Sequence, residues 1–240
     1  MSELGKQLIT ALQHRLKEKR WYRGKLDGIS GALTSSAIVD FKQAHNLRAR
    51  DFVGPVTLGR LFSEDAKAAP APKRKRGEPL WLAEARRLLG TREAPGKRNN
   101  PVIMDWADDL DQWYPGDDVP WCGLFVAHCM HVGAPGEPQD FNRLGARNWL
   151  DYGDPIDPKV GAICVFWRTH RTRSWNGHVG FIVGEDKSAY HVLGGNQSDA
   201  VTITRISKSR LLGCRAPEGW SGGSSVLESV VSGKLSTNEA

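Results

Sequence analysis

The sequence predicts an α+β protein, in which a small all-α domain precedes a larger domain of helices packed on an antiparallel sheet. Up to about residue 132, apolar residues recur at helical spacing, and from Val160 onward they follow the alternation of strands. A stretch at 67–79, rich in Ala, Pro, Lys and Arg, separates the two parts because it cannot build a core. Helices that come before strands, rather than between them, favour an antiparallel sheet.

These observations divide the chain into four segments. We predict a three-helix domain at 1–66, a basic Ala/Pro linker at 67–79, the larger domain at 80–220 and a tail at 221–240. The tail is rich in Gly and Ser, so we expect it to be flexible, with a weak helix at 226–231. The KRKR run of the linker has an alternative interpretation as a nucleic-acid-binding or targeting patch.

In the first domain, three apolar patterns predict three short helices joined by Gly-containing turns. The second helix is expected to begin at Thr34, whose hydroxyl can cap free amides. A bundle of about 60 residues can fold alone, although its core is small. The apolar faces comprise Leu4, Leu8, Leu12, Leu16, Ala37, Ile38, Phe41, Ala44, Val56, Leu58, Leu61 and Phe62.

The larger domain is expected to carry its helices first and its strands afterwards. Turn-forming residues separate the strands, and Pro120 stands just ahead of the third helix, where the first amides have no partner. The patterns place helices at 79–90, 105–110 and 121–132, and strands at 160–167, 178–185, 189–195 and 201–207.

Composition and charge narrow the classes of function. With 40% hydrophobic and 25% charged residues, the 240-residue chain suits a soluble globular protein, and no apolar run approaches the roughly 20 residues that span a bilayer. The N-terminal residues lack a signal-peptide pattern, so we expect synthesis in the cytoplasm. The net charge of +6 is concentrated in 1–79, which suggests an anionic polymer as partner. We expect no nucleic acid, because the basic run is short and lacks interleaved aromatic residues.

One of the four cysteines is a candidate nucleophile. Cys122 falls in the first turn of the helix expected at 121–132, where free amides and the helix dipole favour a thiolate, and its own amide could stabilise an oxyanion. Gly123 leaves room for a substrate. Spacing alone supports a nucleophile and a buried thiol at Cys122 equally. The other cysteines, Cys129, Cys164 and Cys214, are expected to be small buried hydrophobic residues. Without a CxxC pair we expect no structural zinc, and a cytoplasmic chain of this size needs no disulfides.

A thiol nucleophile needs a base, and His178 is the best candidate. It opens the strand expected at 178–185, and Gly177 and Gly180 keep the space around its ring open. His191, in the following strand, is the main rival.

The base also needs a partner that orients its ring. Asn196 lies in the turn GGNQSD, which a strand and a return strand would bring alongside His178. Its carbonyl could accept from one imidazole nitrogen and hold the other toward sulfur. Asp199 is the competing candidate, and a simple tight turn is the alternative interpretation of the motif.

Residues 80–220 resemble the CHAP type of cysteine, histidine-dependent amidohydrolase/peptidase, within the papain-like cell-wall hydrolases. The motifs that carry the resemblance are PWCGLFVAHCM, GHVGFIVGED and GGNQSDAVTI, in that order. The resemblance implies a papain-like fold with Cys122 as nucleophile, His178 as base and Asn196 as orienting residue. Trp121 and Gly123, beside the cysteine, are expected to contact substrate. Many relatives have Glu two residues before the Asn, where this chain has Gly194.

Residues 1–66 are similar to the three-helix peptidoglycan-binding domain of many cell-wall hydrolases. The DGISG turn, the helix that follows it, and the VGPVTL turn carry this likeness. The resemblance implies that Leu26, Asp27, Gly28 and Gly31 lie at the surface that contacts glycan or stem peptide. The family more often has FQ where this chain has Phe41 followed by Lys42.

Together the two resemblances imply a peptidoglycan hydrolase of the phage or prophage endolysin kind. It would be an N-acetylmuramoyl-L-alanine amidase or a stem-peptide endopeptidase, a monomer that acts on the cell wall after release, without membrane insertion. We expect no metal and no cofactor, because the acidic segment DWADDLDQWYPGDD lacks a ligand spacing for calcium. The alternative is a non-catalytic wall-binding or structural phage protein.

Overall fold

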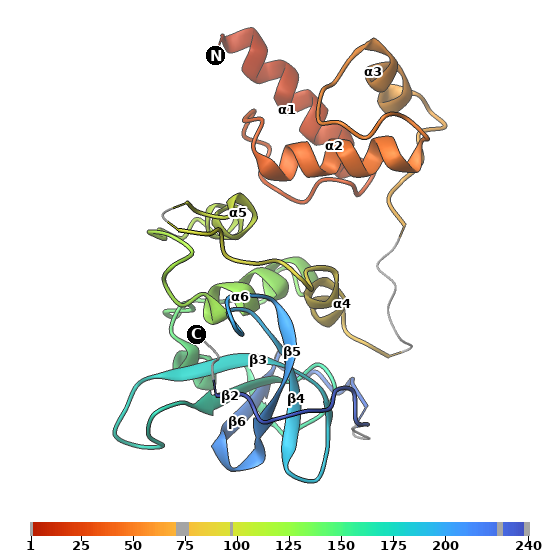
Figure 1. Cartoon of the computed structure of the whole chain (residues 1–240). Coiled ribbons are helices and arrows are strands. Elements are labelled where there is room, and N and C mark those ends of the chain that lie inside the picture. Colours follow the sequence, from red (N-terminus) through yellow and green to blue (C-terminus); the bar gives the residue numbers. More distant parts are fainter. Residues whose placement is uncertain (1, 71–76, 97, 225–227, 238–240) are drawn as a thin grey trace. The chain divides into compact units, whose positions relative to one another are not determined.

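The structure is a computed structural model, and it describes residues 2–70, 77–96, 98–224 and 228–237 (Figure 1). The chain divides into two compact units, Met1–Ala71 and Pro72–Ala240, called here the front unit and the larger unit. In the described part of the chain, no helix is both long and apolar enough to cross a membrane.

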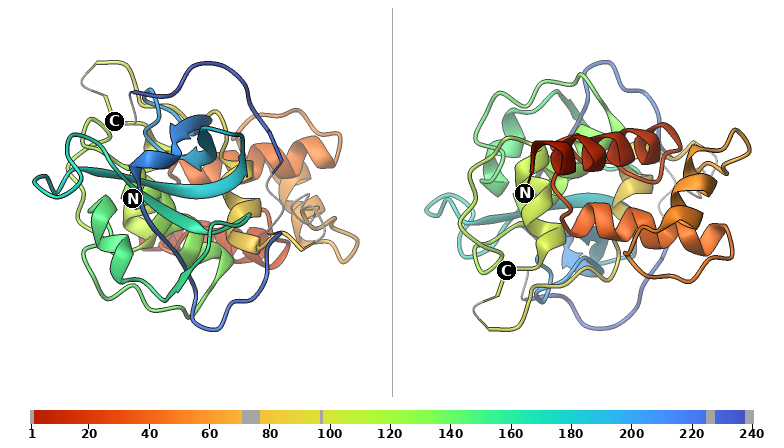
Figure 2. Two further views of the ribbon diagram at one scale, coloured as in Figure 1. Left: turned by 90° about the horizontal axis from the view of Figure 1, so that it is seen from below. Right: turned by 90° about the horizontal axis from the view of Figure 1, so that it is seen from above.

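Three helices form the front unit around a small apolar core: α1 (Glu3–Glu18), α2 (Ala32–Ala44) and α3 (Pro55–Phe62). α1 and α2 lie side by side (Figure 2, right). The all-α domain that apolar spacing predicts is thereby confirmed. Its core consists of Leu12, Leu16, Tyr22, Ala37, Ile38, Phe41, Leu61 and Ala66.

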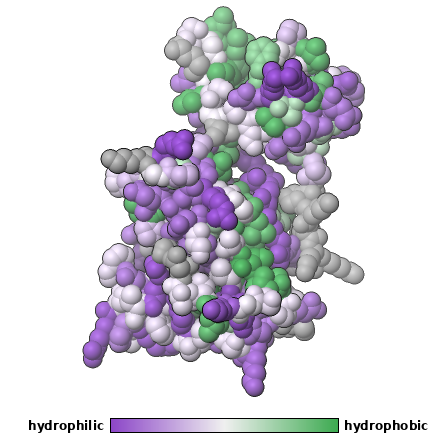
Figure 3. Space-filling view, in the orientation of Figure 1, coloured by the Kyte–Doolittle hydropathy of each residue, from purple (hydrophilic) through white to green (hydrophobic). Residues whose placement is uncertain are grey.

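The apolar faces of these helices are only partly buried in the core. Leu4 and Leu8 in the first half of α1, and Phe62 at the end of α3, are exposed, although their spacing assigns them to apolar faces. Figure 3 shows hydrophobic residues on the surface of the front unit. Thr34 does not cap α2 as expected. Gly31 is the N-cap, and the Thr34 hydroxyl, in the first turn, donates to the carbonyl of Ile29 at 3.2 Å.

Both described ends of the segment expected to be a linker contact a folded unit. The Ala69 amide donates to the Lys19 carbonyl at 2.7 Å, and the Trp21 indole donates to the Lys67 carbonyl at 2.9 Å. At the other end, Glu78 is buried and pairs with Arg86 at 2.7 Å. The KRKR run, 73–76, lies outside the described residues.

The larger unit has helices on one side of a six-stranded antiparallel sheet (Figure 1). Its strand order is β1-β6-β2-β3-β4-β5, and α6 packs against β3 and β4. This confirms the predicted α+β class. The helices are α4 (Leu80–Arg87), α5 (Pro101–Asp109) and α6 (Cys122–Gly133), with a 3-10 helix η1 (Ala146–Asp151). The strands are β1 (Asp154–Ile156), β2 (Ile163–Trp167), β3 (Gly177–Glu185), β4 (Ala189–Gly194), β5 (Thr202–Ser207) and β6 (Leu211–Ala216).

Strands β1 and β6 were not expected from the sequence. β6 follows β5 through the 3-10 helix η2 (Lys208–Arg210), without the Gly or Pro that usually marks a turn, and it inserts between β1 and β2. Helix α5 also begins earlier than expected, because Asn100 caps it by accepting from the Val102 amide at 2.8 Å.

The described part of the tail lies along the sheet and is not helical. The Glu185 amide donates to the Glu228 carbonyl at 3.1 Å, and the Ser236 amide donates to the Arg205 carbonyl at 2.7 Å. The expected helix at 226–231 is therefore wrong for 228–231, while 226 and 227 lie outside the described residues. These bonds to β3 and β5 provide partners that the composition of the tail does not reveal.

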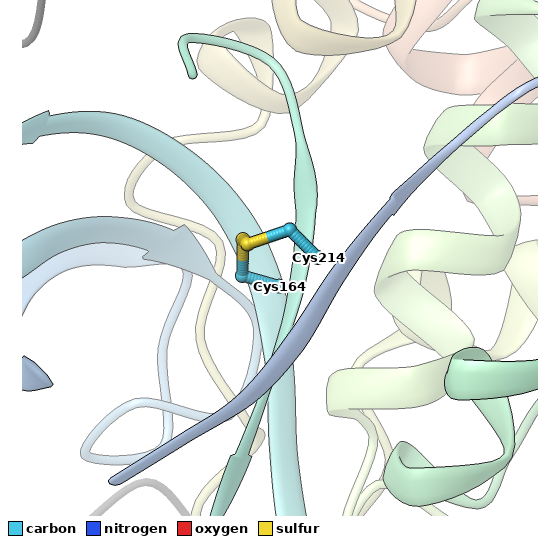
Figure 4. Close-up of a disulfide and its surroundings, with 2 residues drawn as sticks. All are labelled: Cys164 and Cys214. Carbon is cyan, nitrogen blue, oxygen red and sulfur yellow. A yellow bond between two sulfur atoms is a disulfide. The ribbon is translucent and has the colours of Figure 1, made fainter. Parts of the chain in front are cut away.

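A disulfide joins two of the four cysteines, contrary to the expectation that all are reduced. Cys164 on β2 and Cys214 on β6 lie directly opposite each other in the ladder, with their Cα atoms 4.2 Å apart (Figure 4). The expectation failed because β6 was not predicted, and only its pairing with β2 brings the two thiols together. Cys122 and Cys129 are free.

We predict that this disulfide stabilises the larger unit. Closing a loop of 50 residues restricts the unfolded chain by about 4 kcal/mol. The double variant Cys164→Ser/Cys214→Ser should lose about that much free energy of unfolding, measured by urea denaturation with tryptophan fluorescence, and reductant should destabilise the parent chain equally. The double variant itself should not respond to reductant. An unfolding midpoint of the parent chain that is the same with and without reductant would contradict the prediction.

Candidate active site

The candidate nucleophile lies where α6 meets β3. α6 begins at Cys122, and the side chain is 3% exposed. The backbone amide of Val179 on β3 is close enough to the Cys122 sulfur to lower the pKa of its thiol. Because Val179 directly follows His178, this contact brings the start of α6 to the part of β3 that carries the candidate base.

Burial decides the protonation of Cys122. It raises the pKa of the thiol, while the amides of Val179 and Gly123 and the charge of Arg168 lower it by a smaller amount. The amides at the helix start act in the direction that the sequence suggests, but they do not outweigh desolvation. The raised pKa favours the thiol over the thiolate, so forming the nucleophile calls for a base.

His178 is fully buried on β3, and Gln197 holds its ring. The His178 Nε2 and Gln197 Oε1 atoms are 3.1 Å apart. The Gln197 amide nitrogen donates to the carbonyls of Gly194 at 3.2 Å and Thr202 at 2.6 Å, so its oxygen faces the imidazole. Thr204 donates to the same oxygen at 2.8 Å. An acceptor opposite Nε2 places the imidazole proton there, and leaves Nδ1 as the basic nitrogen.

Gly194 lies close against the candidate base and against Gln197. A Cβ atom at Gly194 would lie 2.9 Å from His178 Nε2 and 3.1 Å from the Gln197 side chain. Gln197 thus occupies the space that a larger residue at 194 would need. The sequence pattern did not identify Gln197, although the threonines at 202 and 204 on β5 are a signal, since they provide polar partners for it on one face of the strand.

Asn196, the expected orienting residue, has Glu93 and Trp121 as its side-chain partners. Its backbone has φ of 56°, and its side chain turns toward the start of α6. With its amide oriented to suit both neighbours, Asn196 Nδ2 donates to Glu93 Oε1 at 3.0 Å and its Oδ1 accepts from the Trp121 amide at 3.2 Å. Asp199, the competing candidate, is exposed, and its carbonyl accepts from the Glu93 amide at 3.0 Å.

Trp121 and Gly123 are part of the protein core and do not present a surface for substrate. Trp121 is fully buried, and its indole donates to Glu93 at 2.7 Å. A Cβ atom at Gly123 would lie 2.5 Å from the carbonyl oxygen of Arg143 and 2.4 Å from that of Leu144. The space beside Gly123 is therefore filled by this chain's own backbone, not left open for substrate.

His191, the rival base, has a structural role in the tail contact. Its Nε2 donates to Asp186 at 2.9 Å, and its Nδ1 accepts from the Val230 amide at 2.8 Å. The bonds from Arg205 and then His191 hold the pKa of Asp186 far below its usual range. Both ring nitrogens of His191 are thus engaged, Nδ1 by the tail and Nε2 by Asp186.

The DGISG turn of the front unit is built on buried Gln13. The Gln13 amide donates to Asp27 Oδ1 at 2.8 Å, and the Gly28 amide donates to Gln13 Oε1 at 2.9 Å. Gly28 has φ of +72°, which favours glycine. Of the residues expected at a binding surface, Leu26 and Asp27 are exposed, Gly28 is buried, and Gly31 is half-buried as the N-cap of α2.

Two separate parts of the chain match known domain families. Residues 114–196 match the CHAP domain family, and residues 5–61 match the putative peptidoglycan binding domain. The chain thus contains a CHAP domain behind an N-terminal peptidoglycan-binding domain. It is similar to the N-acetylmuramoyl-L-alanine amidase CwlM of Mycobacterium tuberculosis, with 22% identity over 86% of this chain, which spans about half (52%) of that relative. No solved structure matches the chain.

Proposed function

We propose that this protein hydrolyses an amide bond of peptidoglycan, with Cys122 as nucleophile, His178 as base and Gln197 as positioning residue. The observation that carries the proposal is that the Cys122 sulfur meets the amide next to His178, whose ring Gln197 fixes with Nδ1 as its basic nitrogen. The match to the CHAP domain family and the similarity to an amidase support the same reaction class.

The reaction follows from these groups. His178 takes the thiol proton, the Cys122 sulfur attacks the amide carbonyl carbon, and amides at the start of α6 stabilise the developing oxyanion. The C–N bond breaks as the His178 imidazolium gives its proton to the leaving amine, which leaves a thioester on Cys122. His178 then takes a proton from water, the hydroxide displaces the sulfur, and the products are a carboxylic acid and the free thiol.

The front unit supplies binding to the wall and takes no part in the chemistry. Its match to a peptidoglycan-binding family supports this role, and its tether to the larger unit raises the effective concentration of the enzyme at the wall. The protein acts as a monomer on the cell wall after release, in the manner of an endolysin. The disulfide of β2 and β6 suits an oxidising location outside the cytoplasm.

The name of the relative favours the bond between muramic acid and L-alanine over a bond within the stem peptide. Digestion of purified sacculi tests the reaction class. The expected result is release of soluble fragments with new free amino groups and no rise in reducing sugar ends. A rise in reducing ends without new amino groups would assign a glycosidase, and release of neither would refute the hydrolase.

A further inference from the structure

An open cavity of about 690 Å³ lies on the surface of the larger unit and includes Glu93 in its lining. Residues 90–95 and 98–102, between the end of α4 and the first turn of α5, line it. This volume falls within the range of about 300–1,000 Å³ that is typical of small-ligand sites. It is large enough for an amino-acid residue of a bound peptide.

Hydrogen bonds from two sides hold the lining segment in place. Asp117, which is 2% exposed, accepts from the amides of Ala94 at 2.9 Å and Asn100 at 2.7 Å. On the other side, the Gly90 amide donates to the Val201 carbonyl at 2.9 Å, and the Val201 amide donates back to Thr91 at 2.8 Å. Hydrogen bonds to the backbone of the lining residues therefore hold the cavity in shape before a ligand binds.

Glu93 joins this cavity to the candidate active site. Its side chain lines the cavity, and its Oε1 atom accepts from the Trp121 indole at 2.7 Å and from Asn196 Nδ2 at 3.0 Å. Trp121 directly precedes Cys122, and Asn196 directly precedes Gln197. One carboxylate thus contacts both segments that carry the proposed catalytic residues.

The charges around the cavity suit a zwitterionic ligand. Glu93 is the one acidic side chain among the described residues that line it, and Arg92 and Arg98 supply positive charge. Burial raises the pKa of Glu93, the hydrogen bond from Trp121 lowers it by a smaller amount, and the charges of Asp199 and Asp117 raise it. A cationic group bound next to Glu93 would offset both the burial and the repulsion. The guanidinium groups are suited to bind carboxylates.

We propose that this cavity binds the diamino acid of the stem peptide, with the side-chain amino group paired to Glu93 and carboxylates facing Arg92 and Arg98. This inference rests on the proposed function, because it takes peptidoglycan as the substrate. It makes Glu93 a specificity-determining residue: a stem peptide with a free amine is the preferred substrate, and a stem peptide whose amine is acylated, as in a cross-link, is a poor one.

The test compares one soluble muropeptide in two forms, with its diamino-acid amine free and with that amine acetylated. For the parent protein, acetylation should raise KM about 10-fold and leave kcat nearly unchanged. Glu93→Gln should raise KM for the free-amine form by a similar factor, and acetylation should then have no further effect. Asp118→Asn is the matched control, since Asp118 is exposed and adds to the charge near Glu93 without lining the cavity. It should change KM less than 2-fold.

Three outcomes would overturn the inference: equal KM values for both forms with the parent protein, discrimination that survives in Glu93→Gln, or a loss of kcat shared equally by both forms. The last would mean that Glu93 only positions Trp121 and Asn196. Calorimetric titration of Cys122→Ala with both muropeptides separates this inference from the proposed function. If Cys122→Ala binds the free-amine muropeptide more tightly but the parent protein turns over neither form, only the proposed hydrolase is refuted. If the parent protein turns over the muropeptide but Cys122→Ala binds both forms equally, only the proposed subsite is refuted.

Discussion

Cys122→Ala should lower hydrolysis of a soluble muropeptide by at least about 1,000-fold and leave binding to sacculi unchanged. The reason is that the variant removes the atom that forms the thioester, while the front unit still binds the wall. Initial rates by chromatography and co-sedimentation with sacculi measure the two quantities.

Cys129→Ala is the matched control for this variant. Cys129 is the other free cysteine, lies on the same helix α6 and is fully buried. Burial raises the pKa of its thiol well above the usual value. Its replacement should cost some stability and leave the rate within about 3-fold of the parent. A large loss of rate with Cys129→Ala and none with Cys122→Ala would show that the nucleophile is misassigned.

His178→Ala should lower kcat by about 1,000-fold, because no other group would take the thiol proton or protonate the leaving amine. Gln197→Ala should lower kcat by about 100-fold, since the ring would remain but lose the acceptor that fixes it. Steady-state kinetics on a soluble muropeptide measures both variants, and circular dichroism checks that each is folded.

Asn196→Ala is the comparison for Gln197→Ala, because the two residues are neighbours, and Gln197 bonds to His178 whereas Asn196 bonds to Glu93 and Trp121. Removing Asn196 leaves the His178 contact in place and weakens the start of α6, so its loss of kcat should be smaller. A larger loss with Asn196→Ala than with Gln197→Ala would show that the motif position, and not the observed contact, identifies the orienting residue.

The sequence was sufficient for the parts of the fold that depend on local pattern. Helical spacing located α1 and α6, and alternation located β3 and β4, so the segments that carry Cys122 and His178 could be placed before the structure was known. Strand β6 could not be predicted, because its position between β1 and β2 depends on pairing with distant residues. The Cys164–Cys214 disulfide was missed for the same reason.

The third site residue shows a different limit of sequence patterns. Asn196, Ser198 and Asp199 have positive φ values, so the turn reverses side-chain directions over single residues. Backbone geometry therefore decides which of the two adjacent side-chain amides, that of Asn196 or that of Gln197, faces His178. The structure brings Gln197 to His178 and directs Asn196 to Glu93.

The most direct test of the central claim identifies the residue that carries the acyl group during turnover. A reaction with a soluble muropeptide is quenched in acid, which preserves thioesters, and the digested protein is mapped by mass spectrometry. The account predicts that the acyl half of the substrate is attached to the peptide that contains Cys122, and to no other. An adduct on Cys129 or on any other residue would contradict it.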